Sequence, residues 1–463
     1  MYPRGRPEWS MRDVDVIVVG MGPGGEDAAE RLAAAGLSVA GVDDRLVGGE
    51  CPYWGCVPSK MMIRAANLLA EARRIPGMAG AVQVQPDWAP VARRIRVEAT
   101  DDWDDKVAVD RFTGKGGQFF RGHGRLTAPD QVTVGDEVLR ARRGILLNPG
   151  TEPAVPPIDG LAGTPYWTNR EAIEATEVPG SLVVMGGGPV AVELGQVFAR
   201  FGTRVTVLEG SRRLVPAEEP EASELLQDVF ARDGIDVRCG ATAEAVRHDG
   251  AQFITTLADG AGEQVSADAL LVATGRRTDL AGLGVGVLGV DETGRTIPVD
   301  GHLRVAPGVW AIGDVTGHGP FTHMSMYQAN IAIADILGEP APPAEYHAVP
   351  RVTFTDPEIG AVGLTEAQAR EQGSTVRTGV AKVPESARGW IHKVGNDGFI
   401  KLVADADRGI LAGATSAGPA GGEVLSMLTL AVHARVPVRR LREMIYAYPT
   451  FHRAIESALQ ALG

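Results

Sequence analysis

Two separate stretches of this chain contain the same succession of a strand, a glycine-rich turn, a helix and a second strand. In the first, the apolar run Asp15–Val19 is typical of a buried parallel strand, and an alanine-rich helix is predicted over Glu26–Ala35. The turn between them has three glycines in the pattern G-x-G-x-x-G: Gly20, Gly22 and Gly25. A second strand over 38–42 ends at Asp43. Such a turn lets a pyrophosphate approach the helix N terminus, so the unit predicts a dinucleotide site.

The second stretch repeats this unit. A strand over Leu182–Met185 leads into a turn with Gly186 and Gly188, and Ala191 stands where the third glycine would be. After a predicted helix, a strand over 204–208 ends at Glu209. The first glycine and the closing carboxylate are 23 positions apart in both units. A lone glycine pattern is a weak signal, whereas two complete units with equal spacing indicate two dinucleotide sites.

The acidic residues that close the units bear on the choice of nicotinamide. Asp43 and Glu209 are placed to accept hydrogen bonds from ribose hydroxyls. Glu209 would repel a 2′-phosphate, which favours NAD. Two features favour NADP instead. Ala191 replaces the third glycine, and Arg212, three residues after Glu209, could pair with a phosphate. The sequence therefore favours NAD and leaves NADP open.

Two cysteines, Cys51 and Cys56, lie five positions apart in a segment interrupted by Pro52, Gly55 and Pro58. Five residues of regular helix separate α-carbons by about 8 Å, beyond the roughly 7 Å that a disulfide spans. We therefore expect a locally distorted helix, with the prolines and the glycine supplying the distortion. A dithiol at the start of a helix lies where the helix dipole favours thiolate, which indicates a redox-active pair.

Size and composition narrow the function class. A chain of 463 residues suggests two to four domains, and a net charge of −13 without a basic run argues against nucleic acid or an anionic membrane as partner. Three cysteines do not make an extracellular disulfide framework, and Cys239 is expected to be an inert core or edge residue. The histidines show no metal-ligand spacing, so we expect no metal site. Two dinucleotides beside one dithiol suggest a flavin between a nicotinamide and sulfur.

The expected location is the cytoplasm. Met1–Met11 contains Arg4 and Arg6 but no apolar run like that of a signal peptide. No stretch of eighteen uninterrupted apolar residues occurs in the sequence, so we expect no membrane span.

Several later motifs match those of a known protein family. They add to the Cys-x4-Cys segment and to the Pro58-Ser59-Lys60 that follows it. Four segments match in order: Ala273–Arg277, Trp310–Asp314, Thr355–Gly360 and Asp397–Leu402. Together the motifs resemble the class I pyridine nucleotide-disulfide oxidoreductases, the family of dihydrolipoamide dehydrogenase, glutathione reductase and mercuric reductase. The resemblance covers nearly the whole chain.

The resemblance implies an α/β fold with two Rossmann-like dinucleotide-binding domains and a C-terminal α+β dimerisation domain. The implied FAD-binding domain is discontinuous, over 1–155 and 280–345, with an NAD(P)-binding domain over 156–279 and an interface domain over 346–463. Proline-rich stretches at 150–160 and 340–343 agree with two of these boundaries. By resemblance, the last domain builds a homodimer and lends its tail to the partner's active site.

The resemblance also assigns roles. Cys51 would attack the substrate, Cys56 would form the charge-transfer contact with the flavin, and Lys60 would lie near flavin N5 with Glu193 as its ion-pair partner. A fixed cation there would stabilise an anionic reduced ring, and burying it requires a counter-charge. Besides Lys60, the residues expected to contact the cofactors are Gly20, Gly22, Gly25, Asp43, Gly49, Gly186, Gly188, Glu209, Gly275, Asp314 and His323.

The chain departs from the family near its C terminus. Disulfide reductases of the family have a histidine where this chain has Tyr448, and a glutamate where it has Arg453. Tyrosine, with a pKa of about 10, is a poor base at neutral pH. His452 is one residue off and on a helix would point about 100° away. A tyrosine here resembles mercuric reductase, but that enzyme's C-terminal cysteine pair is missing.

Two further departures from the family pattern lie near the predicted cofactor sites. Tyr53-Trp54 stand between the cysteines, and Asn148-Pro149-Gly150 stand where Ala-Thr-Gly is usual.

The sequence thus predicts a homodimeric, FAD-dependent NAD(P)H oxidoreductase that passes electrons through the Cys51–Cys56 dithiol to a small disulfide or thiol-reactive acceptor. Poor activity with dihydrolipoamide and glutathione disulfide is expected, because the proton-relay histidine is absent. Two alternatives stay open. One is direct delivery from the flavin to a quinone, a metal ion or oxygen, and the other is a redox-sensing flavoprotein without efficient turnover.

Overall fold

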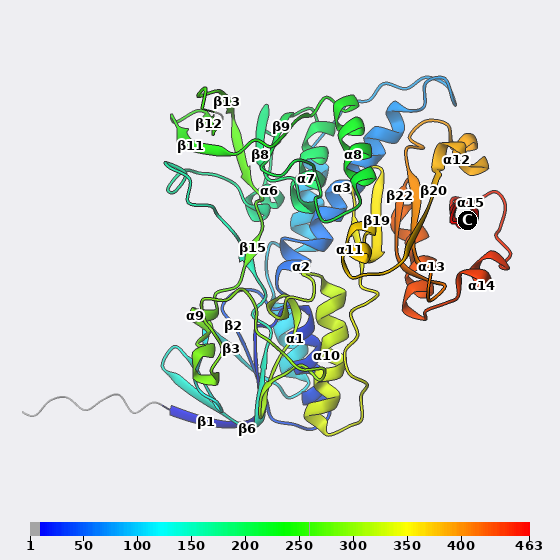
Figure 1. The fold of residues 1–463 in the computed structure, drawn as a ribbon. Helices are drawn as coiled ribbons and strands as arrows, with labels where there is room; N and C mark the ends of the chain where they lie inside the picture. The colour runs from blue at the N-terminus through cyan, green and yellow to red at the C-terminus, as the bar shows by residue number, and fades with distance from the viewer. Residues whose placement is uncertain (1–9, 259) are drawn as a thin grey trace, which may run out of the picture. The chain divides into compact units, whose positions relative to one another are not determined.

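The computed structural model describes residues 10–258 and 260–463, which fall into two compact units (Figure 1). The first unit combines the described residues up to Pro58 with Arg96–Glu152 and Arg276–Tyr346. The second combines Ser59–Ile95, Pro153–Gly275 and His347–Gly463. Each unit is assembled from three stretches of chain, so residues far apart in the sequence share one core.

The first unit is built on an eight-stranded sheet whose path runs β16-β17-β6-β1-β2-β3, with β4 and β5 continuing from β6. The strands are β1 (Ser10–Val19), β2 (Val39–Asp43), β3 (Gln118–Arg121), β4 (Gly124–Ala128), β5 (Gln131–Val134), β6 (Glu137–Leu147), β16 (Arg304–Ala306) and β17 (Val309–Ala311). β1 lies between β2 and β6 and is parallel to both. Its residues Val16, Ile17 and Val18 are fully buried, as expected for a central parallel strand.

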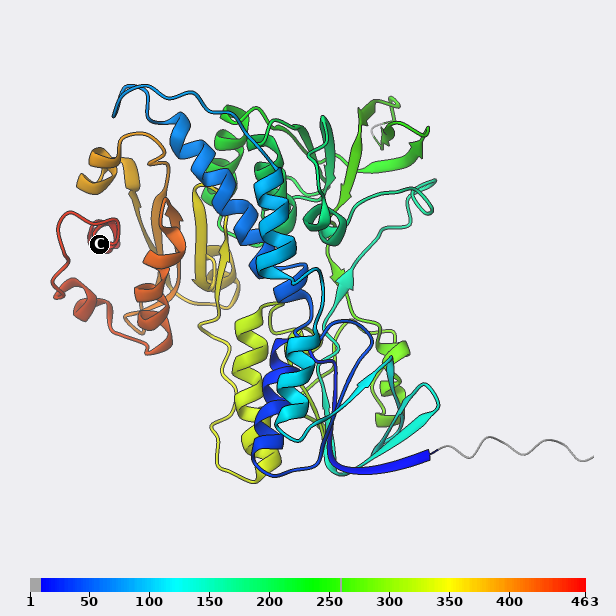
Figure 2. The same cartoon turned by 180° about the vertical axis from the view of Figure 1, so that it is seen from behind.

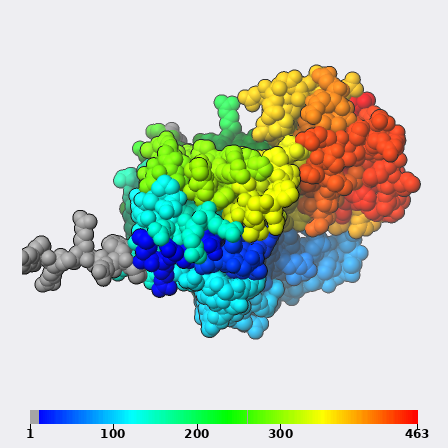
Figure 3. Space-filling view, turned by 90° about the horizontal axis from the view of Figure 1, so that it is seen from below, coloured from blue at the N-terminus to red at the C-terminus, as the bar shows by residue number. Residues whose placement is uncertain are grey.

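Three helices cover one face of this sheet: α1 (Pro23–Ala34), α5 (Lys106–Gly114) and α10 (Thr322–Leu337), which lie side by side in Figure 2. A Cβ on Gly24 of α1 would lie 2.1 Å from Ser325 Oγ of α10, so only glycine lets the helices approach this closely. Shorter helical elements of this unit are α2 (Glu50–Tyr53), α9 (Leu280–Leu283), η2 (Val285–Leu288) and η3 (Gly313–Thr316). In Figure 3 the blue, cyan and yellow-green segments of this unit adjoin one another on its surface.

The second unit contains a parallel sheet, β10-β9-β8-β14, and a small antiparallel sheet, β11-β12-β13. The strands are β8 (Ser181–Met185), β9 (Arg204–Glu209), β10 (Asp236–Cys239), β14 (Ala269–Val272), β11 (Ala243–His248), β12 (Phe253–Leu257) and β13 (Gln264–Ala267). Helices near them in the chain are α6 (Asn169–Glu174), α7 (Pro189–Arg200) and α8 (Pro220–Arg232). Two helices come from an earlier part of the chain: α4 (Ala89–Arg94) and most of α3 (Cys56–Arg73).

The C-terminal part of the second unit is a five-stranded antiparallel sheet in the order β18-β19-β22-β21-β20. Its strands are β18 (Pro350–Thr353), β19 (Glu358–Gly363), β20 (Val376–Lys382), β21 (Phe399–Asp405) and β22 (Ile410–Gly418). The helical elements around it are α11 (Glu366–Glu371), η4 (Val383–Glu385), α12 (Ala387–His392), α13 (Gly421–His433), α14 (Val438–Arg442) and α15 (Ala454–Ala461).

The predicted secondary structure is largely confirmed, with shifted boundaries. The helix expected from Glu26 begins at Pro23, because proline suits the first turn of a helix and Gly22 has the extended backbone of an N-cap. Cys239 is the last residue of β10, an edge strand. The fold is α/β, with parallel strands behind both glycine turns and an α+β C-terminal part.

The two units alternate along the chain at Pro58/Ser59, Ile95/Arg96, Glu152/Pro153, Gly275/Arg276 and Tyr346/His347. Short elements stand at some of these positions: η1 (Ile95–Ala99, a π-helix), β7 (Glu152–Pro153) and β15 (Arg276–Arg277). The division into three domains at the predicted boundaries stays a prediction.

In the part of the chain that the structure describes, no helix has both the length and the apolar character that crossing a membrane requires. The expectation about the N terminus concerns Met1–Met11, of which Met1–Trp9 lies outside the described residues.

Candidate functional site

The helix that carries the two cysteines is interrupted between them. α2 ends at Tyr53, and α3 begins at Cys56 after a turn through Trp54 and Gly55. A Cβ on Gly55 would lie 3.0 Å from the carbonyl oxygen of Glu50, so the turn favours glycine. The predicted distortion is therefore confirmed. Both cysteines have free thiols, with Cys51 half-buried and Cys56 exposed.

The environment of the two thiols differs. A hydrogen bond to Cys56 raises the pKa of the Cys51 thiol well above its usual range, and burial adds to the effect. Cys56 Sγ lies 3.4 Å from the hydroxyl oxygen of Thr322, the first residue of α10. The Cys51 thiol therefore keeps its proton at neutral pH, although a hydrogen bond to Thr322 lowers its pKa in part. Sequence reasoning missed Thr322, although it directly precedes the His323 that it did select.

Tyr53 and Trp54, the aromatic departures between the cysteines, pack against each other with ring centroids 5.9 Å apart. Tyr53 is buried, and burial raises the pKa of its hydroxyl to about 12, with the nearby charge of Asp105 adding to the effect. The phenol is therefore a packing group that stays protonated at neutral pH.

In the second unit, Lys60 and Glu193 form an ion pair with 2.7 Å between Nζ and Oε2. Glu193, on α7, is buried, whereas about a third of the Lys60 side chain is exposed (36%). The other carboxylate oxygen of Glu193 accepts a 2.8 Å hydrogen bond from the amide of Phe354. The Phe354 ring centroid lies 4.6 Å from the Lys60 ammonium, which adds a cation–π contact. Phe354 has no sequence signal, because the contact joins positions nearly 300 residues apart.

The same face of α7 holds the segment that follows Phe354. The Gln196 amide accepts from the Asp356 backbone N–H (2.8 Å) and donates to the Asp356 backbone carbonyl (3.0 Å). The buried Arg200 donates to the Asp356 carboxylate (2.8 Å) and to Asn67 Oδ1 on α3 (2.7 Å). Lys60 thus belongs to a network of hydrogen bonds that fixes α3 against α7.

In the first unit, the glycine turn has two tightly packed positions and one open one. Gly20 has φ +91°, and a Cβ there would lie 2.1 Å from the carbonyl oxygen of Asn148. A Cβ on Gly25 would lie 2.0 Å from the carbonyl oxygen of Gly20. Among the described residues, the one atom that would lie within 4 Å of a Cβ added at Gly22 is Asn148 Nδ2, at 3.3 Å. The turn therefore presents its open backbone at Gly22, where a pyrophosphate could approach the N terminus of α1.

Asp43, at the end of β2, organises this turn. One carboxylate oxygen accepts from the Met21 amide (2.7 Å) and the other from the Arg45 amide (2.8 Å). Burial raises the pKa of Asp43, and the two hydrogen bonds offset only part of this rise. Gly49, with φ +66°, backs the turn, because a Cβ there would lie 2.8 Å from Cα of Gly22. These features fit the adenosine half of a dinucleotide.

Asp314 lies at the start of η3 and accepts a 2.7 Å hydrogen bond from the Thr151 hydroxyl. Burial raises its pKa. Arg276 donates to the hydroxyl oxygen (2.7 Å) and the carbonyl oxygen (2.6 Å) of Thr151, which fixes that residue. His323 is exposed, and its ring stacks on that of Phe321 with centroids 5.1 Å apart.

Asn148, which replaces the usual alanine of the family, connects three parts of the first unit. Its amide nitrogen donates to the carbonyl oxygen of Gly20 (3.2 Å), and its amide oxygen accepts from Ser325 Oγ on α10 (3.1 Å). A Cβ on Gly313, next to Asp314, would lie 2.7 Å from the same oxygen. This departure from the family therefore stabilises the wall behind the glycine turn.

The second glycine turn has the same division of roles. Gly186 has φ +109° and a Cβ there would lie 2.3 Å from the carbonyl oxygen of Ala273, whereas a Cβ on Gly188 would meet nothing within 4 Å. Ala191 is fully buried, so its methyl group packs without blocking the turn. Glu209 accepts a 2.6 Å hydrogen bond from the Ser211 amide, and Arg212 is exposed. The open turn and the carboxylate at the end of β9 fit a second dinucleotide.

Gly275 follows β14, and Cys239 is the last residue of β10; these are the two edge strands of this sheet. Gly275 has φ +130° and its carbonyl oxygen accepts from the Ala154 amide (2.9 Å). Cys239 lies opposite Glu209 in the pairing of β10 with β9, and burial raises the pKa of its thiol.

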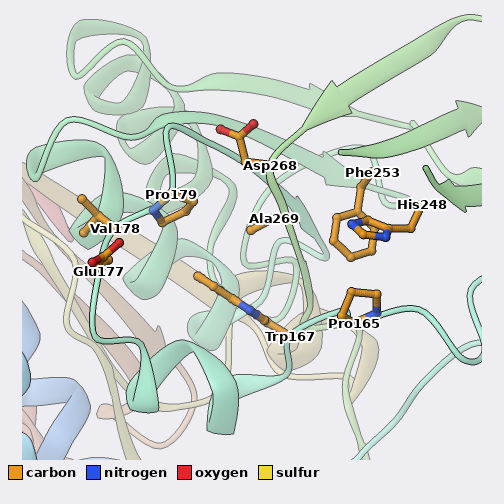
Figure 4. A pocket seen from close by; sticks show the side chains of 9 residues that line it. All are labelled: Pro165, Trp167, Glu177, Val178, Pro179, His248, Phe253, Asp268 and Ala269. Atoms are coloured by element: carbon orange, nitrogen blue, oxygen red, sulfur yellow. The ribbon is translucent and has the colours of Figure 1, made fainter. Parts of the chain in front are cut away.

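A shallow cavity of about 240 Å³ lies at the other edge of the same parallel sheet, where β8 and β14 begin (Figure 4). In Figure 4 the rings of His248 and Phe253 lie on one side of it and Trp167 below, with Asp268 beside Ala269 at the start of β14. Ligands of such sheets bind beyond the carboxyl ends of the strands, so this cavity is separate from the second glycine turn.

Tyr448 and its neighbours lie near the C-terminal end of the second unit. Tyr448 is 70% exposed, and the Arg453 guanidinium lies 5.5 Å from its ring centroid. The expectation that His452 lies on a helix is wrong. It stands in a turn before α15, with its ring 6.2 Å from that of Tyr446. Among the described residues, no group of three or more His, Cys, Asp or Glu could hold a metal ion.

Comparison with known proteins agrees with this arrangement. Residues 14–334 match the model of the pyridine nucleotide-disulphide oxidoreductases, and residues 349–459 match that of their dimerisation domain. The chain is 34% identical to dihydrolipoyl dehydrogenase of Thermus scotoductus, covering 98% of both chains, and 33% identical to mercuric reductase of Streptomyces lividans, covering 96% of this chain and 95% of the relative.

Solved structures give the same picture. The Cu(II) complex of the HOCl-induced flavoprotein disulfide reductase RclA from Escherichia coli matches with a TM-score of 0.85 at 25% identity, over 97% of this chain and 99% of that one. LpdA from Mycobacterium tuberculosis matches with a TM-score of 0.84 at 26% identity, over 97% and 99%. Both glycine turns and both cysteines lie within the residues matched by the first family model. The chain is a member of the pyridine nucleotide-disulfide oxidoreductase family.

Proposed function

We propose that this enzyme uses a reduced nicotinamide to keep the Cys51–Cys56 pair in its dithiol form, and that the dithiol reduces a small disulfide or another thiol-reactive acceptor. The observation that carries the proposal is the break in the helix between α2 and α3, which separates Cys51 from Cys56, with the Thr322 hydroxyl 3.4 Å from the Cys56 sulfur. Family membership supplies the reaction class, and the acceptor is the new element.

Two cofactors follow from the two glycine turns. FAD would be held by the turn at Gly22, by Asp43 and by Asp314, and NAD by the turn at Gly188 and by Glu209. We favour NAD over NADP because the Glu209 carboxylate would repel a 2′-phosphate. The bound flavin supplies electron transfer between a hydride donor and the sulfur pair. The Lys60 ammonium, held by Glu193 and Phe354, would provide a fixed positive charge for that ring.

The thiol chemistry is carried by the chain itself. Cys51 passes its proton to the Cys56 thiolate and attacks one sulfur of the acceptor disulfide, so that a Cys51–acceptor S–S bond forms and the acceptor's own S–S bond breaks. The first thiolate leaves and takes the proton from Cys56. The Cys56 thiolate then attacks the Cys51 sulfur, which forms the Cys51–Cys56 disulfide and releases the second acceptor thiolate, protonated by solvent. The acceptor gains the two electrons that the dithiol loses.

An anaerobic titration of the FAD-loaded enzyme with NADH, and separately with NADPH, tests this proposal. After two electrons we expect a long-wavelength absorbance band that reports the Cys56 thiolate against the flavin. The band should be lost in Cys56→Ser, and NADH should reach the end point at lower concentration than NADPH. Bleaching of the flavin without such a band would favour delivery from the flavin itself.

A soft metal ion is the second candidate acceptor. Tyr448 in place of histidine favours it, and the relatives include mercuric reductases and a reductase solved as a Cu(II) complex. In Cys51→Ser/Cys56→Ser, metal reduction should survive if the flavin acts directly and should stop if the dithiol acts.

The match to the dimerisation domain over 349–459 indicates a homodimer. We propose that the loop around Tyr448 enters the active site of the partner subunit. The exposed apolar side chains of this region support the proposal: Ile445 is 95% exposed and Tyr448 70%.

A further inference from the structure

Four arginines line a cavity of about 440 Å³ at one end of the five-stranded sheet. Arg377 comes from β20, Arg408 from the turn between β21 and β22, and Arg439 and Arg442 from α14. The cavity lies within residues 377–463, whereas the two glycine turns lie at 20–25 and 186–191. None of its lining residues belongs to either predicted dinucleotide site.

The positive charge of this cavity is not balanced by acidic side chains. Its one carboxylate side chain is that of Asp405, which is buried and accepts hydrogen bonds from the backbone amides of Asp407 (3.1 Å) and Arg408 (3.0 Å). Arg442 donates to the main-chain oxygens of Leu459 (2.8 Å) and Gly463 (3.1 Å).

Within residues 10–258 and 260–463, none of the four guanidinium groups forms an ion pair with an aspartate or glutamate side chain. Arg377 also approaches the main-chain oxygen of Gly463 (3.4 Å). The side chains of Arg408 and Arg439 have no hydrogen-bond partner among the described residues. The next residue of α14, Arg440, is paired with Glu443 at 2.9 Å.

Some other arginines of this acidic chain pair with carboxylates, as Arg351 does with Glu218 and Arg200 with Asp356. The four exposed arginines of the cavity outnumber its one carboxylate side chain, that of Asp405, so their positive charge favours an anion there. The flat guanidinium fork matches two oxygens of a phosphate group, and a cavity of this volume is in the range of small-molecule sites.

We propose that this arginine cavity binds a small anion with two or more linked phosphate groups. A single phosphate would engage only one or two of the four guanidinium groups, whereas linked phosphates can reach those of β20, the turn and α14 together. Linked phosphates occur both as inorganic polyphosphate and as the phosphate chain of a nucleotide, so the test must separate these two sources.

Isothermal titration calorimetry of the FAD-loaded enzyme with tripolyphosphate, ATP and orthophosphate provides the test. We expect one tripolyphosphate per chain, bound at least about tenfold more tightly than orthophosphate. ATP binding more tightly than tripolyphosphate would identify the nucleotide as the source, and the reverse order would identify the inorganic anion.

The variant Arg408→Gln/Arg439→Gln should weaken tripolyphosphate binding at least about tenfold. The matched control Arg440→Gln removes the same kind of charge from α14 outside the cavity, and it should change binding by no more than about twofold at physiological salt. Both variants should keep the melting temperature and the rate of flavin reduction by NADH. Arg408→Gln alone, in an exposed turn, provides a milder variant that does not alter α14.

Three results would overturn the proposal. The first is the absence of binding with any of the three anions. The second is unchanged binding in Arg408→Gln/Arg439→Gln, which would place the anion at a glycine turn. The third is an equal loss in Arg440→Gln, which would show that net charge alone attracts the anion.

Discussion

The two cysteines are chemically unequal although they are close in sequence. The Cys51 thiol is half-buried and hydrogen-bonded to Cys56, and both effects raise its pKa. Cys56 is exposed and has the Thr322 hydroxyl beside its sulfur. In the proposed mechanism Cys56 would take the proton of Cys51, a role for which Tyr448 is a poor base at neutral pH.

This inequality predicts the order of alkylation. In the dithiothreitol-reduced enzyme, iodoacetamide at pH 8 should modify Cys56 before Cys51, because only thiolate reacts and a raised pKa keeps Cys51 protonated until the pH is well above its usual value. Replacing Cys56 by alanine removes the hydrogen-bond acceptor, so the pH midpoint for Cys51 alkylation should fall. Peptide mass spectrometry measures both.

Cys239→Ser is the control for alkylation, because it removes the third thiol without touching the pair. Faster modification of Cys51 than of Cys56 in this control would show that the proton rests on Cys56 instead.

The residues that sequence reasoning selected for the candidate site belong to short motifs, such as those of Cys51, Lys60 and Asp43. It missed Thr322 and Phe354, whose importance comes from contacts with positions hundreds of residues away. It noted Asn148 only as a departure from the family. Its two hydrogen bonds to Gly20 and Ser325 could not be read from a linear pattern.

At the scale of elements, each glycine turn contains positions required for packing and one position with fewer close neighbours. Gly20 and Gly186 have positive φ and lie against carbonyl oxygens of neighbouring strands or loops, whereas Gly22 and Gly188 do not. The glycine pattern in the sequence treats these positions as equivalent. Only the structure separates glycines needed for folding from glycines available to a ligand.

This division predicts different effects for two alanine substitutions in the first turn. Gly20→Ala should destabilise the protein by about 3 kcal/mol or more, because a left-handed backbone and a clash with the Asn148 carbonyl combine. Gly22→Ala should fold with a free energy of unfolding within about 1 kcal/mol of wild type and lose most of its FAD, since the methyl group would occupy the pyrophosphate approach.

Urea unfolding of the apoproteins and flavin absorbance per chain measure these two effects. Gly188→Ala is a matched control in the second turn and should keep full FAD content. Full FAD content in Gly22→Ala would contradict the assignment of this turn to the pyrophosphate.

Element boundaries were less predictable than element identity. β1 begins at Ser10, five residues before the predicted strand, because Ser10–Asp13 pairs with Glu137–Arg140 of β6. Arg12 and Asp13 are polar, and Met11, Arg12 and Asp13 are exposed, so this stretch has no alternating apolar pattern for a sequence argument to detect. Pairing with a distant strand, rather than local preference, determines where β1 starts.

At the scale of the whole molecule, the missing histidine and glutamate near the C terminus are the main difference from the family's disulfide reductases. Tyr448 and Arg453 occupy the two positions, and the Arg453 guanidinium lies over the Tyr448 ring. Because we propose that this loop serves the partner subunit, its chemistry would decide which acceptors the dimer reduces.

The double variant Tyr448→His/Arg453→Glu should therefore gain activity with glutathione disulfide or dihydrolipoamide. We expect wild-type turnover to be poor and the variant to improve it by about 10²-fold, the usual contribution of a positioned general base. Steady-state assays with both compounds measure the gain. Tyr448→Phe is the control and should show none. Robust turnover of either compound by the wild-type enzyme would contradict the prediction.

The position of Asn148 has a consequence for the order in which the protein is made. Its partners are Gly20, near the start of the chain, and Ser325 of α10, so the wall behind the first glycine turn needs residues separated by some 300 positions. At ribosomal rates of about 5–20 residues per second, the turn waits some tens of seconds for α10 to emerge. Capture of FAD is therefore a late event in biosynthesis, and a nascent chain truncated before Thr322 should leave the ribosome without its flavin.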